Sequence, residues 1–201
     1  MSTETSNKTF LLATGNRGKQ REFAQVMAPL GWQLRGLHEF DLPEVEETGL
    51  SFVENALLKA RAASAGTNLP ALADDSGLVV PFLNGEPGIY SARYAGKHGD
   101  SEGNMQRLLE RLADAEGEQR AAYFYCALAW VDHAEDPTPK LALGRWSGHI
   151  LKARQGDGGF GYDPIFQPLG DTRSAAELLP EEKNRLSHRG LAIAELLPQL
   201  A

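Results

Sequence analysis

The sequence predicts an α/β protein with a central mixed sheet covered by helices. Over the first half of the chain, short apolar runs alternate with stretches of helical spacing, a pattern that favours strands joined by helices. Two longer apolar runs, 121–131 and 141–151, then follow one another across a polar loop, which indicates a hairpin with a wide loop. An alternating region followed by adjoining long strands is typical of a mixed sheet.

Length and composition fit one folded domain. The chain has 201 residues, of which 42% are hydrophobic and 23% charged, close to the averages of globular proteins. Neither an internal repeat nor a low-complexity linker divides it. We therefore expect residues 1–8 to form a flexible polar tail and residues 9–201 to form a single domain.

Charge and cysteine content exclude several classes of protein. The net charge of −7 disfavours general adhesion to nucleic acid or to an anionic membrane. Cys126 is the only cysteine and lies in an apolar run, which excludes an internal disulfide and a cysteine-based zinc site. The polar start with Glu4 does not resemble a secretory signal, and no run is long enough to span a membrane. We expect a cytoplasmic protein.

The chain begins with a strand at 9–14, a helix at 18–30 and a second strand at 32–37. The turn between the first strand and the helix reads TGNRGK. Its glycines let backbone N–H groups approach a ligand, and the following helix presents its positive end to an anion. The Walker phosphate motif is not met, because Ala13 stands where its first glycine is needed and Gln20 follows Lys19. An ordinary strand-to-helix connection with solvated cations is the alternative.

The next helix is marked by its start and by one unusual residue. Ser51 and Glu54 have the spacing of a capping box. Lys59 then interrupts a mostly apolar stripe that contains Phe52, Ala56 and Ala63. A cation in that position indicates a specific role.

Acidic residues follow in a predicted turn. The sequence favours short strands at 69–73 and 78–83 on either side of DDSG. Adjacent carboxylates at Asp74 and Asp75 repel, and a Mg²⁺ ion would relieve that repulsion while it bridges to phosphates. A plain turn is the alternative, since Asp, Ser and Gly are common turn residues. The acidic loop with Glu46 and Glu47 is a second source of carboxylates.

The remainder contains a third helix that starts near Ser101, the two long strands, a helix after Pro180 and a final helix at 187–197. The string Gly156-x-Gly158-x-x-Gly161 matches the dinucleotide fingerprint, but no helix follows it, so we do not expect a Rossmann site. Phe160 and Tyr162 are suited either to stacking on a base or to filling the core.

Six ordered motifs together resemble the inosine/xanthosine triphosphate pyrophosphatase family. They are TGNRGK at 14–19, EETGLSFVENALLKA at 46–60, ADDSGL at 73–78, PGIYSARYAG at 87–96, GGFGYDPIF at 158–166 and EEKNRLSHRG at 181–190. The resemblance covers the chain from about Phe10 to its end. It implies an elongated α/β fold, two lobes around a deep nucleotide-binding cleft, and a homodimer. It also implies Mg²⁺-dependent hydrolysis of dITP, ITP or XTP to the monophosphate and pyrophosphate, which removes deaminated purines from the nucleotide pool.

The resemblance assigns roles residue by residue. Asp75 is the expected proton acceptor and a metal ligand, and Glu46 is the expected second ligand, with Glu47 or Asp74 as alternatives. Lys19 and Lys59 are the expected catalytic cations at the phosphates, whereas Arg17 is given no catalytic role. The expected substrate-binding residues are Thr14, Gly15, Asn16, Arg17, Gly18, Lys19, Ser76, Phe160, Gly161, Tyr162, Asp163, Lys183, His188 and Arg189.

Two other hypotheses remain at this point. A pyrophosphatase on a related fold that acts on modified pyrimidine nucleotides would use the same phosphate chemistry with a different base pocket. A nucleotide-binding or RNA-associated module without catalysis would show no turnover, although the net charge of −7 disfavours RNA.

Overall fold

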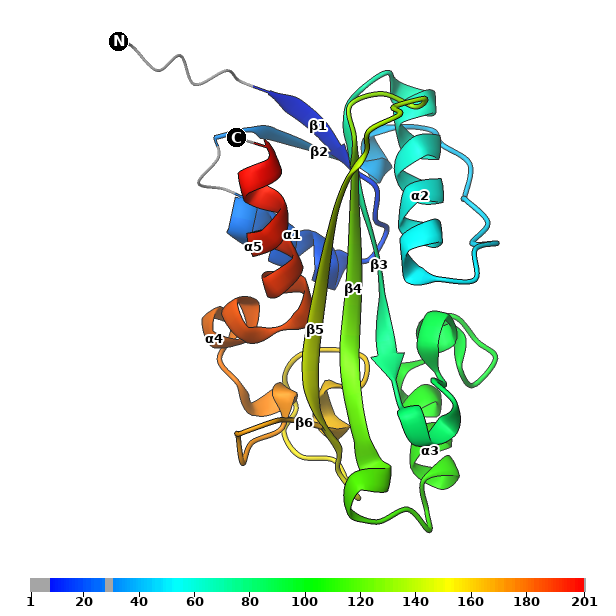
Figure 1. Cartoon of the computed structure of the whole chain (residues 1–201), viewed down its shortest axis with the longest axis vertical. Coiled ribbons are helices and arrows are strands. Elements are labelled where there is room, and N and C mark those ends of the chain that lie inside the picture. Colours follow the sequence, from blue (N-terminus) through cyan, green and yellow to red (C-terminus); the bar gives the residue numbers. More distant parts are fainter. Residues whose placement is uncertain (1–7, 28–30, 201) are drawn as a thin grey trace. The chain divides into compact units, whose positions relative to one another are not determined.

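The structure is a computed structural model that describes residues 8–27 and 31–200, without the side chains of Arg17 and Val26. Five α-helices and six strands are assigned in these residues (Figure 1). The strands are β1 (Thr9–Leu12), β2 (Gln33–Gly36), β3 (Ala71–Val79), β4 (Ala121–Val131), β5 (Lys140–Ile150) and β6 (Phe166–Pro168). The helices are α1 (Arg17–Met27), α2 (Phe52–Thr67), α3 (Ser101–Arg111), α4 (Pro180–Leu186) and α5 (His188–Leu200).

The six strands form one sheet in the order β2-β1-β3-β4-β5-β6. β1 is parallel to both β2 and β3, with Leu12 opposite Leu72, whereas β5 and β6 are antiparallel. β4 and β5 are neighbours, as expected for two long runs joined by a polar loop. The prediction of an α/β fold with a mixed sheet is confirmed.

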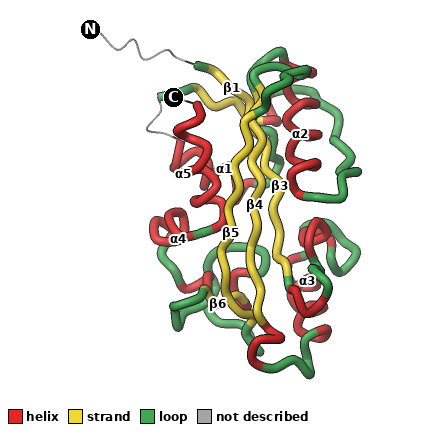
Figure 2. The backbone as a smooth tube through the Cα atoms, in the orientation of Figure 1, coloured by secondary structure: helices red, strands yellow, loops and turns green. Residues whose placement is uncertain are grey.

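The chain forms two compact units, and strands β3, β4 and β5 contribute residues to both. The first unit comprises 1–75, 127–142 and 193–201, and the second comprises 76–126 and 143–192. In the first unit, α1 and α2 lie on opposite sides of the strands (Figures 1 and 2). The predictions of one domain over 9–201 and of two lobes around a cleft stay predictions.

Each unit has its own aromatic core. In the first, Phe10 packs against Trp130 with ring centroids 5.3 Å apart, and Trp32 contacts both rings. In the second, Phe124 lies 4.6 Å from Phe166 within a larger apolar cluster. Rings of this size bury much apolar surface and fix the strands that carry them.

The DDSG segment differs from its prediction. We expected a turn between two short strands, but Asp74, Asp75, Ser76 and Gly77 all lie inside the continuous strand β3. Turn propensity is a local preference, and here the tertiary partners of the two carboxylates override it. The acidic pair therefore belongs to the middle of a strand.

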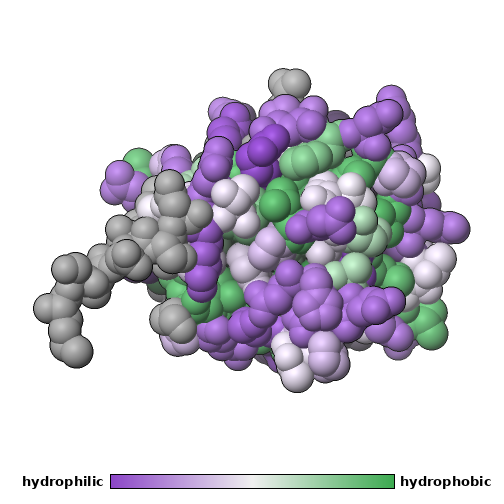
Figure 3. Space-filling model, turned by 90° about the horizontal axis from the view of Figure 1, so that it is seen from above, coloured by the Kyte–Doolittle hydropathy of each residue, from purple (hydrophilic) through white to green (hydrophobic). Residues whose placement is uncertain are grey.

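The N-terminal segment is described only from Lys8 onward. Of the predicted tail, residues 1–7 lie outside the described part, and the Lys8 ammonium lies 4.9 Å from the centroid of the Trp32 ring. The face drawn in Figure 3 mixes hydrophilic and hydrophobic residues. Among the residues described, no helix combines the length and the apolar character needed to cross a membrane.

Candidate functional site

The turn between β1 and α1 is organised by one side chain. Asn16 Oδ1 accepts hydrogen bonds from Gly18 N at 2.9 Å and from Lys19 N at 3.1 Å. Asn16 N in turn donates to Thr14 Oγ1 at 3.3 Å. Such a cap satisfies donors that a helix N-terminus otherwise leaves open. Two of the N–H groups expected to face phosphate are therefore used by the cap.

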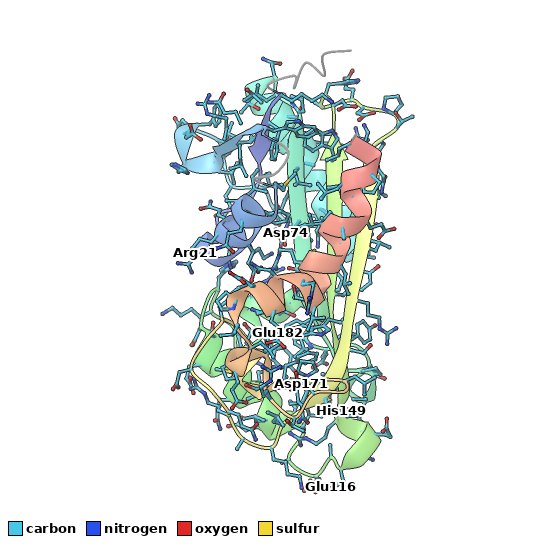
Figure 4. All side chains as sticks on the ribbon, turned by 90° about the vertical axis from the view of Figure 1, so that its left-hand side faces the viewer. Arg21, Asp74, Glu116, His149, Asp171 and Glu182 are labelled. Carbon is cyan, nitrogen blue, oxygen red and sulfur yellow. The ribbon has the colours of Figure 1, made fainter. Side chains whose placement is uncertain are left out.

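Lys19 points toward the acidic strand. Its Nζ lies 2.7 Å from Asp74 Oδ2, whose side chain is fully buried. β1 and β3 run in parallel with Leu12 opposite Leu72, so the chain that follows Leu12 starts beside the residues that follow Leu72 in β3. Arg21, further along α1, points away from the strands in Figure 4, whereas Asp74 lies among them.

Lys59 connects two carboxylates. Its Nζ lies 2.9 Å from Asp75 Oδ1 and 2.8 Å from Glu47 Oε1. Asn55, one turn earlier on α2, donates from Nδ2 to Asp75 Oδ2 at 3.4 Å. The position of Lys59 in an otherwise apolar stripe is explained by this contact, because a cation is needed where a buried strand presents carboxylates.

Burial and neighbouring charges change the ionisation of this cluster. Burial raises the pKa of the Asp75 carboxyl, and the negative charge of Glu47 raises it further, while Lys59 and Lys19 act in the opposite direction. Burial also disfavours the charged form of Lys59, but Asp75, Asp74 and Glu47 together hold its pKa above the usual value. Perturbed groups of this kind are typical of functional sites.

The acidic loop contributes Glu47 to the cluster. Glu47 contacts Lys59 and acts on the charge of Asp75, whereas Glu46 is exposed. Backbone spacing explains the difference, since adjacent residues of an extended segment point to opposite sides. The assignment of Glu46 as a metal ligand stays a prediction, and the structure adds a reason to test Glu47 first.

A second set of predicted residues lies in the other unit. Phe160 N donates to Asp163 Oδ2 at 2.7 Å, and Lys183 Nζ reaches the same oxygen at 2.6 Å. The Lys183 ammonium also lies 4.6 Å from the centroid of the half-buried Phe160 ring. Asp163 thus fixes both a loop backbone and a cation from α4.

The start of α5 joins the same set. Arg189 Nη2 donates to Ser76 Oγ at 3.1 Å, and its guanidinium lies 5.9 Å from the Phe160 centroid. His188 stacks on Phe124 at 4.8 Å with the rings inclined by 12°. Both His188 and Arg189 are buried, so they belong to the interior of this unit.

The predicted residues therefore fall into two groups. Those of the first unit are Thr14, Gly15, Asn16, Gly18, Lys19, Glu46, Lys59 and Asp75, and those of the second are Ser76, Phe160, Gly161, Tyr162, Asp163, Lys183, His188 and Arg189. Arg17 was also predicted to bind substrate, but its side chain lies outside the described part of the structure. Asp75 and Ser76 are consecutive residues of β3.

Sequence reasoning missed Asn55 and Ser91. Asn55 is fully buried and contacts Asp75, and its spacing of four residues from Lys59 on one helix was an available signal. Ser91 accepts a hydrogen bond at its carbonyl from Tyr162 Oη at 2.9 Å. No local pattern marks that contact, because the two residues are far apart in the sequence.

Comparisons with known proteins agree along nearly the whole chain. A model of the Ham1 family matches residues 10–199. The dITP/XTP pyrophosphatase of Thioalkalivibrio sulfidiphilus is 53% identical over 190 residues, which cover 94% of this chain and 97% of that protein. The protein of the same name from Escherichia coli K12 is 50% identical, with coverage of 94% and 96%.

Solved structures show the same likeness. A HAM1 protein from Coxiella burnetii superposes with a TM-score of 0.89 at 44% identity, covering 96% of this chain and 98% of that one. A nucleoside-triphosphatase, or dITP/XTP pyrophosphatase, from Mycobacterium abscessus gives 0.78 at 46% identity, with coverage of 94% and 99%. The α/β fold, the ordered motifs and these matches together place this chain in the Ham1 family.

Proposed function

We propose that this chain is a dITP/XTP pyrophosphatase that hydrolyses dITP, ITP and XTP to the nucleoside monophosphate and pyrophosphate. Relatives about 50% identical along nearly the whole chain carry that name. The structural observation that carries the proposal is Lys59, which lies within 2.9 Å of Asp75 and 2.8 Å of Glu47. Carboxylates with a lysine between them suit a metal-dependent reaction at a polyphosphate.

The first unit holds the phosphate end. Release of pyrophosphate requires water to attack the α-phosphorus while negative charge grows on the oxygen that bridges to the β-phosphate. Lys19 and Lys59 are both partly buried, so their positive charges are screened less than they would be in open water. They bind the triphosphate and stabilise the charge of the leaving group.

Asp75 acts as the proton acceptor for the attacking water. Its burial raises the pKa of the carboxyl, which makes the carboxylate a better base than an ordinary aspartate. Lys59 and Asn55 each contact one oxygen of the carboxylate and thereby orient it.

The same donors suit a divalent cation. Mg²⁺ is usually held by one or two carboxylates and by substrate phosphates rather than by an all-protein cage. Within the described residues, no cluster of three or more His, Cys, Asp or Glu is arranged to hold a metal. Asp75 and either Glu47 or Glu46 would be the protein ligands, and the ion would supply charge neutralisation at the phosphates.

The second unit holds the base end. Phe160 presents a half-buried ring beside Lys183 and Arg189, and stacking on an aromatic ring is a common way to bind a base. Inosine and xanthine carry a 6-oxo group where adenine has an amine, so the donors of His188 and Arg189 favour the oxo form. Guanine is rejected through its 2-amino group, at the cost of an unmatched buried polar group.

A substrate panel tests the proposal. Pyrophosphate release is measured with dITP, XTP, dATP and dGTP in the presence of Mg²⁺, and again after chelation with EDTA. We expect kcat/KM for dITP and XTP to exceed that for dATP and dGTP by about a hundredfold or more, a ratio that buried polar contacts can supply. Equal rates on all four nucleotides would contradict the specificity, and undiminished turnover in EDTA would contradict the metal.

We also propose a cytoplasmic homodimer that does not bind nucleic acid. One cysteine, Cys126, which is buried, suits a reducing compartment, and the net charge of −7 disfavours nucleic acid. Light scattering of the purified protein gives the subunit number, and a single-subunit mass at micromolar concentration would contradict the dimer.

A further inference from the structure

The proposed reaction uses no residue of the motif PGIYSARYAG at 87–96. Its centre is Ser91, which is buried. Ser91 Oγ accepts a hydrogen bond from Leu78 N at 2.9 Å and donates to Gly88 O at 2.6 Å. The side chain therefore fastens this segment to the end of β3.

The fit between the two segments is close. A Cβ placed on Gly77 would lie 2.4 Å from Ser91 Oγ and 2.5 Å from Gly88 O. A residue with a side chain at position 77 would push the segment away, so the glycine is required for the contact. Gly77 follows Ser76 directly in β3, and Ser76 accepts the hydrogen bond of Arg189.

The backbone of Ser91 makes a third contact, with the loop proposed to bind the base. Tyr162 Oη donates to Ser91 O at 2.9 Å. Tyr162 is only 5% exposed and its ring belongs to the apolar cluster of this unit. A ring enclosed in this way cannot stack on a ligand, whereas Phe160, two residues earlier, is half-buried.

The base loop needs such an attachment. Gly159 and Gly161 have φ angles of 70° and 63°, in the region that other residues rarely adopt, and glycine leaves a backbone more freedom than other residues do. The contacts that restrain the loop around Phe160 include the hydrogen bond from Phe160 N to Asp163 and that from Tyr162 Oη to Ser91 O.

We propose that Tyr162 is a positioning residue. Its hydroxyl attaches the loop around Phe160 to Ser91, and Ser91 is attached to β3 beside Ser76. This inference rests on the proposed function, because it assigns the base-binding role to Phe160. Ser91 is the other half of the attachment, so this residue of the motif at 87–96 supports the base site. Tyr162 itself contacts neither base nor phosphate.

Tyr162→Phe and Tyr94→Phe form a matched pair for the test. Both tyrosines are at least 92% buried in the same cluster, but Tyr94 Oη donates to Glu86 Oε2 at 2.8 Å, whereas Tyr162 Oη donates to Ser91 O. Each substitution removes one hydroxyl and keeps the ring. Tm is measured for both variants, together with KM and kcat for dITP and the inhibition constant of inorganic triphosphate, which has no base.

We expect Tyr162→Phe to raise KM for dITP by about three- to tenfold, the range that the loss of one hydrogen bond gives. Its kcat should stay within about twofold, because contacts remote from the reacting phosphorus mainly affect binding. Weak inhibition by inorganic triphosphate should be unchanged. Tyr94→Phe should lower Tm by a similar amount and leave KM for dITP unchanged.

Ser91→Ala provides an independent arm, since it removes the bonds to Leu78 and Gly88 and keeps the carbonyl that Tyr162 contacts. It should raise KM in the same way, and the double variant should show less than the product of the single effects. Equal KM values for Tyr162→Phe and Tyr94→Phe would overturn the inference. Hydrolysis of dITP by the unaltered protein is measured first. If that protein failed to hydrolyse dITP, the proposed function itself would be wrong, whatever the variants showed.

Discussion

The ammonium of Lys59 lies 2.9 Å from the carboxylate of Asp75, and burial raises the pKa of that carboxyl. A carboxylate held in this way is costly to the fold and useful to the reaction. Asp75→Asn should therefore reduce kcat by about a thousandfold or more, as the loss of a general base and metal ligand does. Its Tm should equal or exceed that of the unaltered protein.

The control for Asp75→Asn is Asp132→Asn, whose carboxylate lies 2.8 Å from Lys140 and is 57% exposed. That variant should keep full activity. A fall in Tm of Asp75→Asn in step with its activity would show instead that Asp75 serves the fold.

Lys19 contacts Asp74 and is proposed to bind the phosphates, and two variants can separate these roles. Because Lys19 Nζ lies 2.7 Å from the fully buried carboxylate of Asp74, Lys19→Met removes a cation that compensates a buried charge, which costs about 3 kcal/mol, or roughly 6–12 °C in Tm for a chain of this size. Adding Asp74→Asn should restore most of the Tm. Turnover of dITP should stay low in both variants, because the phosphate still lacks its lysine; recovery of kcat/KM in the double variant would contradict the catalytic role.

Much of the fold could be predicted because local signals and tertiary structure agree. The N-cap half of the capping box predicted for Ser51 and Glu54 is present at the start of α2, where Glu54 N donates to Ser51 Oγ at 3.3 Å, while the Glu54 carboxylate accepts from Leu50 N and Ser51 Oγ. β3 could not be predicted as one strand. Its acidic residues are poor strand formers taken alone, and the lysines that make them acceptable come from α1 and α2, far away in the sequence.

The residue types of the candidate site could be named from the sequence, but the burial and contacts of each residue could not. Tyr162 and Phe160 look equivalent in the sequence, yet one is buried and hydrogen-bonded and the other half-buried. Glu46 and Glu47 also look equivalent in the sequence, yet Glu47 pairs with Lys59 and Glu46 is exposed. The path of the loop backbone decides which of the two side chains reaches Lys59. Burial of this kind depends on contacts between distant segments, which periodicity does not encode.

A charged network beside α4 gives a prediction about pH. Arg173 pairs with Asp171 and with Glu182, which is on α4 near Lys183 (Figure 4). Hydrogen bonds from Arg173 lower the pKa of Asp171 from 3.8 to about 2. Because the folded state lowers this pKa, the pair stabilises the fold above pH 3.8, and that contribution is lost as pH falls from 3.8 to about 2.

Arg173→Gln should therefore return the pKa of Asp171 toward 3.8, as followed by carboxyl ¹³C shifts in an acid titration. The matched control is Glu182→Gln, which leaves the contacts between Arg173 and Asp171 in place, and the pKa of Asp171 should then stay near 2. Identical titration curves in the two variants would contradict the pairing.

Gly144 of β5 sets how closely α5 approaches the sheet. A Cβ at this position would lie 1.8 Å from His188 O and 2.8 Å from Ala192 N, so any side chain must displace the first turn of α5. Gly144→Ala should shift His188 and Arg189, raise KM for dITP by about tenfold and reduce the preference for dITP over dGTP.

Gly148→Ala is the matched control in the same strand, since its Cβ would meet Gln167 O at 2.2 Å rather than α5. Both variants should lose stability through the forced backbone shift, but only Gly144→Ala should change the ratio of kcat/KM between the two nucleotides. An unchanged ratio would show that the start of α5 does not read the base.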